Sequence, residues 1–245
     1  MRLPAAPTIV EIGAGTGTLA RALARALPGA RIVATDRSAR MLAEAQRAAD
    51  ADPALAARIA HRTAPAEALG LPDGSADLVV GAFVHQLVRD RGPVHAECLR
   101  VLRPGGALAL VTWQAGGALP DAARAFDDVV ADSGCDVPVP GHAPERRAGD
   151  LASPDAAARE LRRAGLRRGA ARATALRTTW DAPGYLALKE AYDEAALFAA
   201  LAPADRDRLR GAAAAAFARL PPDAFVWTAP LVSVVARRPG VAPGG

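Results

Sequence analysis

The residues with the clearest chemical meaning lie in one short segment near the start of the chain. The segment PTIVEIGAGTGTLARAL (7–23) places Gly13, Gly15 and Gly17 between an apolar run and a helical pattern. A glycine turn between a strand and a helix lets the backbone approach a nucleotide-like ligand closely. Glu11 lies inside the apolar run, where a carboxylate is costly unless it has hydrogen-bond partners. The segment therefore predicts a site for a nucleotide-like cofactor, with Glu11 as part of it.

A second acidic residue, Asp36, ends the next apolar run. Its carboxylate can accept hydrogen bonds from both hydroxyls of a ribose. Dinucleotide-binding proteins place an acid at the same point, so Asp36 alone does not choose between a dinucleotide and S-adenosylmethionine. The dinucleotide fingerprint has glycine or alanine three residues after Gly15, where helix and strand pack closely, and Thr18 stands there instead. Thr18 therefore argues against a dinucleotide, and the buried Glu11 requires a role of its own.

Histidine is the side chain best suited to move a proton near neutral pH. His85, in GAFVHQL (81–87), follows an apolar run, and its neutral imidazole could take a proton from a hydroxyl or phenol. A purely structural histidine is the alternative. His142, in PVPGHAPERR, either contacts the substrate from a loop or is solvated. His61 and His95 lie in ordinary positions of predicted elements and receive no role.

Aromatic residues indicate where a substrate would bind. Trp113 ends an apolar run and is predicted to line the substrate pocket. Only 4% of the residues are aromatic, and Trp180 and Tyr185 belong to a concentration of them around the predicted helices of 182–220. We predict that Trp113, Trp180 and Tyr185 contact the substrate. Packing in a helix core is the alternative for the last two.

No residue pattern indicates a metal or a disulfide. The acids closest to a metal-site pattern are Asp127, Asp128, Asp132 and Asp136, and a solvated helix face explains them more simply. Cys98 and Cys135 do not form a CxxC pair. We therefore predict no metal ligand and no disulfide framework.

Apolar runs alternate with helical patterns along the first half of the chain. The predicted strands are 8–12, 31–35, 58–63, 78–83 and 107–113. The predicted helices are 16–27, one after the cap Ser38 that carries Met41, Leu42 and Ala45 inward, and 93–102. Such alternation implies right-handed βαβ units and a parallel sheet covered on both faces.

The order weakens after Trp113. The predicted elements there are a short helix near 121–132, a helix at 153–166, a strand near 168–178, helices at 182–200 and 203–220, and a last strand at 225–237. The fold class is therefore α/β, a Rossmann-like, doubly wound, mostly parallel seven-stranded sheet with a helical insertion before the last strand. We expect a single domain over 1–245, with 1–113 as its cofactor-binding half. We expect 114–150 to be a lid-like loop and 182–220 a substrate-binding insertion.

Composition describes an ordinary globular protein. Of 245 residues, 51% are hydrophobic and 23% charged. The net charge of +4 is mild, and the densest basic run, RRAGLRR (162–168), fits a solvated helix end, so no nucleic-acid partner is expected. The first residues, MRLPAAPTIVE, lack the apolar segment of a signal peptide, and no run has the length of a membrane span. We expect a cytoplasmic protein without a membrane partner, its oligomeric state open.

Four segments, in order, resemble class I S-adenosylmethionine-dependent methyltransferases. VEIGAGTG (10–17) is similar to the family's E-x-G-x-G-x-G, and DRSARMLAEA (36–45) to D-x-S-x-x-M-L-x-x-A. AEALGLPDGSADLVV (66–80) is similar to A-E-x-L-P…D-x-S-F-D-L-V, and ECLRVLRPGGALAL (97–110) to E-x-x-R-V-L-K-P-G-G-x-L. Within the family, the resemblance is to small-molecule enzymes of the ubiquinone/menaquinone-biosynthesis type.

The resemblance implies S-adenosylmethionine as cofactor, S-adenosylhomocysteine as product and a small acceptor, with O- or C-methylation of an apolar or aromatic body favoured. It implies that Glu11 meets the methionine end and that Arg37 and Met41 flank adenine. The cofactor residues it implies are Glu11, Gly13, Ala14, Gly15, Gly17, Asp36, Arg37, Met41, Ala66, Glu67 and Gly81. It places His85 opposite the methyl group, where relatives often have a His-His pair.

Two departures from the family leave alternatives open. Pro65 stands where relatives commonly have an aspartate on the adenine amino group, so either Ala66 and Glu67 cover that edge or Thr63 and Ala64 do. Many relatives carry helices before the first strand, which begins here by Thr8. A more open site, cover by the additions, or cover by another subunit would each fit.

The sequence leaves two other functions open. One is an S-adenosylmethionine-binding protein with a regulatory or non-methylating role, and the other is an RNA or protein methyltransferase. Methyl transfer from a sulfonium is an in-line displacement, for which a protein supplies alignment, exclusion of water and, where needed, a base. No single catalytic signature is therefore expected.

Overall fold

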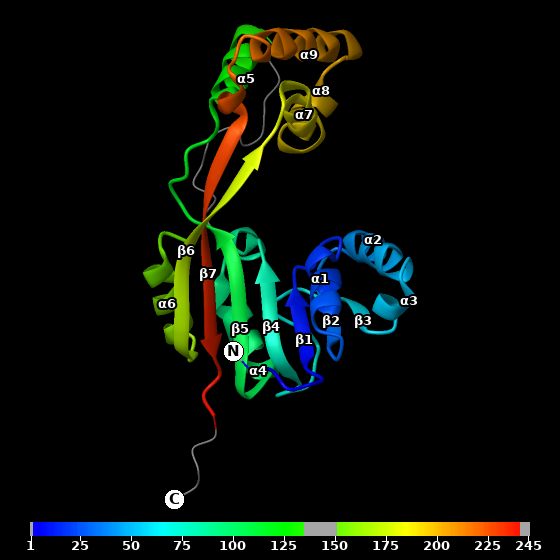
Figure 1. Cartoon of the computed structure of the whole chain (residues 1–245), viewed down its shortest axis with the longest axis vertical. Coiled ribbons are helices and arrows are strands. Elements are labelled where there is room, and N and C mark those ends of the chain that lie inside the picture. Colours follow the sequence, from blue (N-terminus) through cyan, green and yellow to red (C-terminus); the bar gives the residue numbers. More distant parts are fainter. Residues whose placement is uncertain (1, 135–150, 241–245) are drawn as a thin grey trace, which may run out of the picture. The chain divides into compact units, whose positions relative to one another are not determined.

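A computed structural model describes residues 2–134 and 151–240 of the chain and contains a seven-stranded sheet. The strands are β1 (Thr8–Ile12), β2 (Arg31–Asp36), β3 (Ile59–Thr63), β4 (Ala76–Ala82), β5 (Leu102–Trp113), β6 (Arg167–Thr179) and β7 (Val226–Arg237). Their order is β3-β2-β1-β4-β5-β7-β6 (Figure 1). Strands β1 to β5 pair in parallel and β7 pairs antiparallel to β5. The predicted fold class is confirmed.

The helices largely follow the predicted pattern. They are α1 (Thr18–Ala26), α2 (Ala39–Asp50), α3 (Pro53–Ala56), α4 (Arg91–Val101), α5 (Asp121–Asp132), α6 (Pro154–Arg163), α7 (Ala182–Leu188), α8 (Ala195–Ala200) and α9 (Pro203–Phe217). Two short 3-10 segments, η1 (His85–Leu87) and η3 (Pro222–Phe225), and a π-helical segment, η2 (Lys189–Asp193), complete the set. The single helix predicted over 182–200 is wrong, because η2 interrupts it.

The chain forms two compact units. Unit 1 comprises 1–115, 147–174 and 231–245, and unit 2 comprises 116–146 and 175–230, including in each case residues outside the described ranges. The boundaries fall within β6 and β7 and just after β5. Most of the two segments predicted to be additions to the sheet, 114–150 and 182–220, belongs to unit 2.

In unit 1 the sheet is buried on both faces. One face packs on α1, α2 and α3 through a cluster that includes Ile9, Ile32 and Val80. The other face packs on α4 and α6 through a cluster that includes Val10 and Val79. Neighbouring strand residues thus alternate between the two clusters, as side chains on a pleated strand must. The alternation leaves Glu11, like Ile9, facing the α1 side.

Unit 2 has its own core. Aromatic side chains fill it, with Phe126 of α5, Tyr185 of α7 and Phe217 of α9 all buried. The Tyr185 ring meets the rings of Phe217, Phe225 and Trp180 edge-on at centroid distances of 5.6, 5.8 and 5.5 Å. Such edge-to-face contacts add to the stability that burial of the rings provides.

Candidate functional site

The strand order of unit 1 reverses at β1 and β4, which lie side by side with Ile12 opposite Gly81. The chain leaves β1 toward α1 on one face, and leaves β4 toward α4 on the other. In an open α/β sheet, ligands bind in the crevice at the carboxyl ends of the strands where the order reverses. The turn 13–17 follows β1 at this point and η1 follows β4, so the candidate site lies between them.

The turn after β1 requires glycine. Gly13, Gly15 and Gly17 have φ angles of +63°, +54° and +73°, a left-handed region that other residues rarely adopt. A Cβ on Gly13 would lie 2.5 Å from Val84 Cγ2, and one on Gly17 would lie 2.9 Å from Ala45 Cβ. A Cβ on Gly15 would have no atom within 4 Å. The backbone at Gly15 therefore faces open space, where a ligand could approach it.

Thr18 does not have the packing role that the sequence argument gave it. Its side chain is exposed at the start of α1, so no close contact with the strand excludes a side chain at that position. The tight approach to α2 occurs one residue earlier, at Gly17. Gly17 has a left-handed conformation, so α1 begins only after Gly17, at Thr18.

Asp36 ties the glycine turn to the end of β2. Its Oδ2 accepts a hydrogen bond from the Gly15 N–H, and its Oδ1 accepts one from the Ser38 N–H, each at 2.8 Å. The Ala14 N–H donates to the Thr35 carbonyl at 2.9 Å, a second tie between the same two segments. Each carboxylate oxygen has two acceptor positions, so Asp36 retains capacity for two hydroxyl donors.

Glu11 lies near the end of β1, just before the glycine turn, and only 2% of its surface is exposed. Its Oε2 is one of two buried side-chain atoms in the described part of the chain that have no hydrogen-bond partner. Burial raises the pKa of Glu11 from 4.5 to about 7, although the Ala20 N–H and the Arg21 charge both lower it. An orphaned buried carboxylate is costly, and a cationic or hydrogen-bonding ligand would relieve that cost.

The remaining residues predicted at the cofactor lie around this turn with different exposures. Ala14 is buried and Gly81 is buried, whereas Arg37 and Glu67 are exposed and Ala66 is half-buried. A Cβ on Gly81 would lie 2.9 Å from Val84 Cγ1 and 3.0 Å from Ile12 Cγ1, so packing alone explains this glycine.

Met41 was predicted to lie on the inward face of its helix, and this prediction is wrong. It is 46% exposed, because the buried stripe of α2 runs through Leu42, Ala45 and Ala49 instead. The exposed position is compatible with the separate expectation that Met41 flanks adenine.

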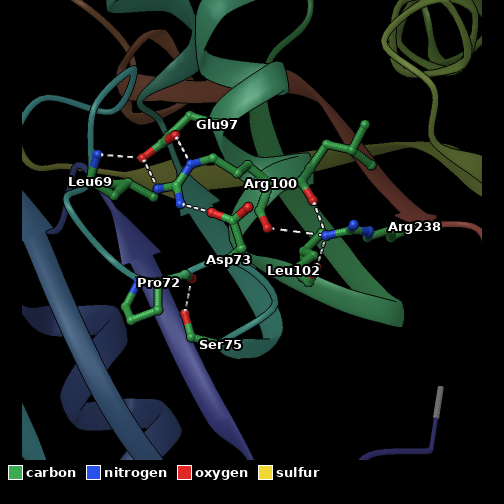
Figure 2. Close-up of polar contacts among 9 residues, drawn as sticks. Leu69, Pro72, Asp73, Ser75, Glu97, Arg100, Leu102 and Arg238 are labelled. Atoms are coloured by element: carbon green, nitrogen blue, oxygen red, sulfur yellow. Dashed lines mark hydrogen bonds and ion pairs between the residues drawn. The ribbon is translucent and has the colours of Figure 1, made fainter.

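A polar network fixes the segment 69–73, which follows Ala66 and Glu67 in the chain (Figure 2). Glu97 of α4 accepts a hydrogen bond from the Leu69 N–H at 2.7 Å and two from the Arg100 guanidinium, which also pairs with Asp73. The hydrogen bonds from Arg100 hold the pKa of Glu97 below its ordinary value. The network therefore anchors both ends of the 69–73 segment to α4.

The same helix end receives a second arginine, which Figure 2 also shows. The Nη1 of Arg238, just after β7, donates to the carbonyls of Leu99, Arg100 and Leu102 at 2.9, 3.1 and 2.5 Å. These contacts satisfy carbonyls that the last turn of a helix leaves without partners. The i,i+3 spacing of Glu97 and Arg100 is visible in the sequence, whereas nothing there pairs Arg238 with helix carbonyls more than 130 residues away.

His85 is buried against a second histidine. Its Nε2 lies 2.8 Å from the Nε2 of His95 on α4, and each residue is only 2% exposed. The Nδ1 of His85 is the other buried atom, within the described residues, that has no hydrogen-bond partner. Burial, with the nearby His95 and Arg91, lowers the pKa of His85 to about 3, so the ring is neutral near pH 7. His95 received no role from the sequence, so this pair was not predicted.

The backbone around His85 is held in an unusual geometry. Phe83 has a φ of +55°, the one non-glycine residue with positive φ in the described chain, and its ring lies 4.6 Å from that of Trp113. The Phe83 N–H donates to the Val111 carbonyl, and Thr112 Oγ1 donates to Gln86 Oε1 at 2.6 Å. These contacts fix η1 to the end of β5. A strained residue held this firmly is typical of a functional site.

The other predicted substrate residues have separate places. Trp113 is half-buried at the end of β5 in unit 1. Tyr185 is buried in the aromatic core of unit 2, with Trp180 packed against it. His142 lies outside the described residues. Within the described part, no group of three or more potential ligands is placed to hold a metal ion, and no helix is long and apolar enough to cross a membrane.

Comparison with known proteins adds a family to this geometry. Residues 10–110 match the family described as a methyltransferase domain. A demethylmenaquinone methyltransferase of Thermus thermophilus is 38% identical over 105 residues, which are 43% of this chain and 46% of that protein. The chain thus spans less than half the length of the curated relatives it matches.

Solved structures share the fold. The YcgJ protein of Bacillus subtilis has a TM-score of 0.62 at 16% identity, over 96% of this chain and 93% of that one. The [4+2]-cyclase SpnF has a TM-score of 0.57 at 21% identity, over 96% of this chain and 76% of that one. At these identities the likeness concerns the fold alone.

Proposed function

We propose that this chain, whose residues 10–110 belong to the methyltransferase domain family, transfers a methyl group from S-adenosylmethionine to a small acceptor. The observation that supports the proposal is the arrangement of two acidic residues where the strand order reverses. The Asp36 carboxylate accepts a hydrogen bond from the glycine turn, and Glu11 keeps a buried oxygen, Oε2, without a partner. The reaction is an in-line displacement that depends mainly on positioning.

The residues present fit this cofactor. When bound, S-adenosylmethionine supplies an electrophilic methyl group on a sulfonium, with a thioether as the leaving group. Asp36 has free acceptor capacity for both ribose hydroxyls, and Gly15 leaves open space above the backbone. Glu11 offers a buried carboxylate oxygen to the ammonium of the methionine end.

The adenine has a matching set of residues. Arg37 and Met41, exposed at the start of α2, flank the ring, and Ala66 with Glu67 covers its edge in place of the aspartate that Pro65 replaces. The network around Glu97 holds the adjoining segment 69–73 in position. Gly13, Ala14, Gly17 and Gly81 shape the backbone around the cofactor.

The acceptor side rests on η1 and the end of β5. His85 acts as the base for a hydroxyl or enol acceptor, and Trp113 lines the acceptor side, which favours an apolar or aromatic body. The lid and substrate-binding roles of 114–150 and 182–220, with Trp180, Tyr185 and His142, stay predictions from the sequence.

Calorimetry with S-adenosylhomocysteine tests the cofactor. We expect Asp36→Ala to weaken binding at least about tenfold, because two charge-assisted hydrogen bonds are lost. Asp50→Ala, which changes an exposed aspartate at the end of α2, is the matched control and should bind like the wild type. No binding by the wild type, or an unchanged affinity for Asp36→Ala, would overturn the proposal.

Isotopic labelling tests the transfer. Cell extract incubated with the protein and a methyl-labelled donor should yield a labelled small molecule, absent with Asp36→Ala. Label in RNA or protein would contradict the small-acceptor class. Binding without any labelled product would favour the alternative, a non-methylating role, for which the shared fold of a cyclase provides a precedent.

A further inference from the structure

The two buried histidines, His85 and His95, form a hydrogen bond with each other. The 2.8 Å separation between their Nε2 atoms requires that one of these nitrogens carries a hydrogen and the other accepts it. The rings lie 5.1 Å apart between centroids, at 23°. His85 keeps its second nitrogen, Nδ1, buried and without a partner. The pair thus has one free end, at His85.

The other end of the pair leads to a carboxylate near the surface. His95 Nε2 lies 3.7 Å from Glu160 Oε1 of α6, whose side chain is 28% exposed. Glu160 is itself held by Arg91 of α4 through two hydrogen bonds, of 2.7 and 2.9 Å. The Glu160 charge raises the pKa of His95 and Arg91 lowers it, against a larger lowering by burial. These are the charged groups that α4 and α6 present to the histidines.

We propose that His95 is a positioning residue that receives the Nε2 hydrogen of His85 while His85 Nδ1 takes the proton of the acceptor, and that Glu160 stabilises the resulting charge on His95. The inference rests on the proposed function, since it supplies the base for that reaction. It also explains how a histidine so strongly disfavoured from holding a positive charge could serve as a base. The charge does not remain on His85 but moves to the ring beside Glu160.

The proton transfers balance in one sequence. The acceptor oxygen bonds to the methyl carbon as the methyl–sulfur bond breaks, and the electron pair remains on sulfur. The acceptor's proton passes to His85 Nδ1, while the hydrogen on His85 Nε2 passes to His95 Nε2. His85 is neutral again, in its other tautomer, and His95 is an imidazolium beside the Glu160 carboxylate. When the product has left, the hydrogen on His95 Nε2 returns to His85 Nε2, and His85 Nδ1 releases its proton to solvent that enters the emptied site, which restores both starting tautomers.

A structural role alone explains the arrangement less well. A buried polar atom without a partner lowers the stability of the folded protein, and an apolar pair of similar size would avoid that loss. The hydrogen bond between Thr112 and Gln86 fixes η1, which contains His85, and Phe83 just before η1 has a strained positive φ. Both features are expected where position matters more than stability.

Nuclear magnetic resonance of histidine labelled with nitrogen-15 tests the pair without any acceptor. The chain has four histidines, so the rings can be assigned by substitution. We expect a scalar coupling across the hydrogen bond between the two Nε2 nuclei, and an unprotonated Nδ1 on His85. Glu160→Gln should move the protonation midpoint of His95 to lower pH. His61→Gln, on β3, should remove one set of signals and leave the coupling unchanged.

A His85 ring that carries its hydrogen on Nδ1, with no coupling to His95, would overturn the relay. So would a His95 midpoint that Glu160→Gln does not move. Neither result depends on cofactor binding, so each is distinguishable from failure of the proposed function, which calorimetry with S-adenosylhomocysteine reports.

Kinetics of transfer from the methyl-labelled donor to the small acceptor that the labelling experiment yields then separates proton transfer from folding. His85→Gln should lower kcat about a hundredfold or more, and His95→Gln about tenfold or more, with unchanged affinity for S-adenosylhomocysteine. Glu160→Gln should lower kcat and shift the acidic limb of the kcat–pH profile to lower pH. A wild-type kcat and pH profile in both His95→Gln and Glu160→Gln would contradict the inference.

Discussion

Replacing Glu11 by glutamine should make the protein more stable at alkaline pH. The pKa of this buried carboxyl rises from 4.5 in the unfolded chain to about 7 in the folded one, mainly through burial. The unfolded chain therefore releases the proton more readily than the folded protein does. The contribution of Glu11 to the free energy of unfolding is fully present below pH 4.5 and is lost as the pH rises to about 7.

The size of the effect follows from the shift. A change from 4.5 to about 7 corresponds to about 3 kcal/mol over the whole titration. Between pH 5.5 and 8.0 the wild type should lose about 2 kcal/mol that Glu11→Gln does not lose. The lowered pKa of His85 acts with the opposite sign, since its contribution is lost as the pH falls below 6.5. Both proteins contain His85, so it cancels in the difference.

The assay must report unit 1. Unit 1 contains Trp113, whereas Trp180 and Trp227 belong to unit 2, and the chain has three tryptophans. Urea unfolding followed by tryptophan fluorescence, in a Trp180→Phe/Trp227→Phe background, therefore measures the right transition. Glu67→Gln, an exposed carboxylate, is the control and should follow the wild type. Parallel curves of unfolding free energy against pH for wild type and Glu11→Gln would refute the reasoning.

Three further predictions concern the supports of the site and the second unit. Gly13→Ala should destabilise the protein by about 2–3 kcal/mol, because the new Cβ would clash with Val84. Gly15→Ala should destabilise it by only about 1–2 kcal/mol, because its Cβ meets no atom and only the backbone is strained. Equal losses of stability in urea unfolding would contradict this reasoning. Glu97→Ala should weaken S-adenosylhomocysteine binding several-fold in calorimetry by releasing the loop at Leu69, and an unchanged affinity would show that the loop does not contact the ligand. Lys189→Met should destabilise unit 2 by about 3 kcal/mol, because the buried ammonium lies 3.4 Å from Asp193 and 3.6 Å from Glu194 and over the Phe126 ring. Adding Glu194→Gln should recover part of that loss, and a full loss in the double variant would show that the charges are not coupled.

Local patterns in the sequence were sufficient for the elements that carry the cofactor site. The Ser38 hydroxyl accepts from the Met41 N–H at 3.3 Å and the Ser153 hydroxyl from the Ala156 N–H at 3.1 Å, as the capping signals predict. The glycine turn could be predicted because positive φ angles leave few residue choices. These features depend on neighbours along the chain, which a single sequence displays.

Side-chain direction was harder to predict. Met41 and Leu42 are adjacent, and a rotation of one residue position around α2 decides which of them is buried. The prediction of one helix over 182–200 was wrong for a related reason. The Lys189 carbonyl accepts its hydrogen bond from the Glu194 N–H, five residues on, which makes a π-helical turn that the apolar pattern does not indicate. Thr18 was misjudged because the turn before it sets the start of the helix.

Contacts between distant elements could not be predicted at all. His85, His95 and Glu160 come from η1, α4 and α6, and only the packing of both helices on one face of the sheet brings them together. Each residue alone had an ordinary explanation. The same holds for the contact of Glu97 with the Leu69 amide and for the contacts of Arg238 with helix carbonyls, because these backbone partners carry no sequence signal.

The two orphaned atoms connect these findings. Within the described residues, Glu11 Oε2 and His85 Nδ1 are the buried side-chain atoms without a hydrogen-bond partner. They come from β1 and from the segment after β4, the two neighbouring strands at which the strand order reverses. Buried polar groups are nearly always satisfied, so two exceptions, one on β1 and one just after β4, are hard to reconcile with a purely structural use. A cationic ligand would satisfy the first, on the α1 side of the sheet, and a hydrogen-bond donor would satisfy the second, beside α4. The instability that Glu11 imposes above pH 7 is then a consequence of the same arrangement that prepares the site for binding.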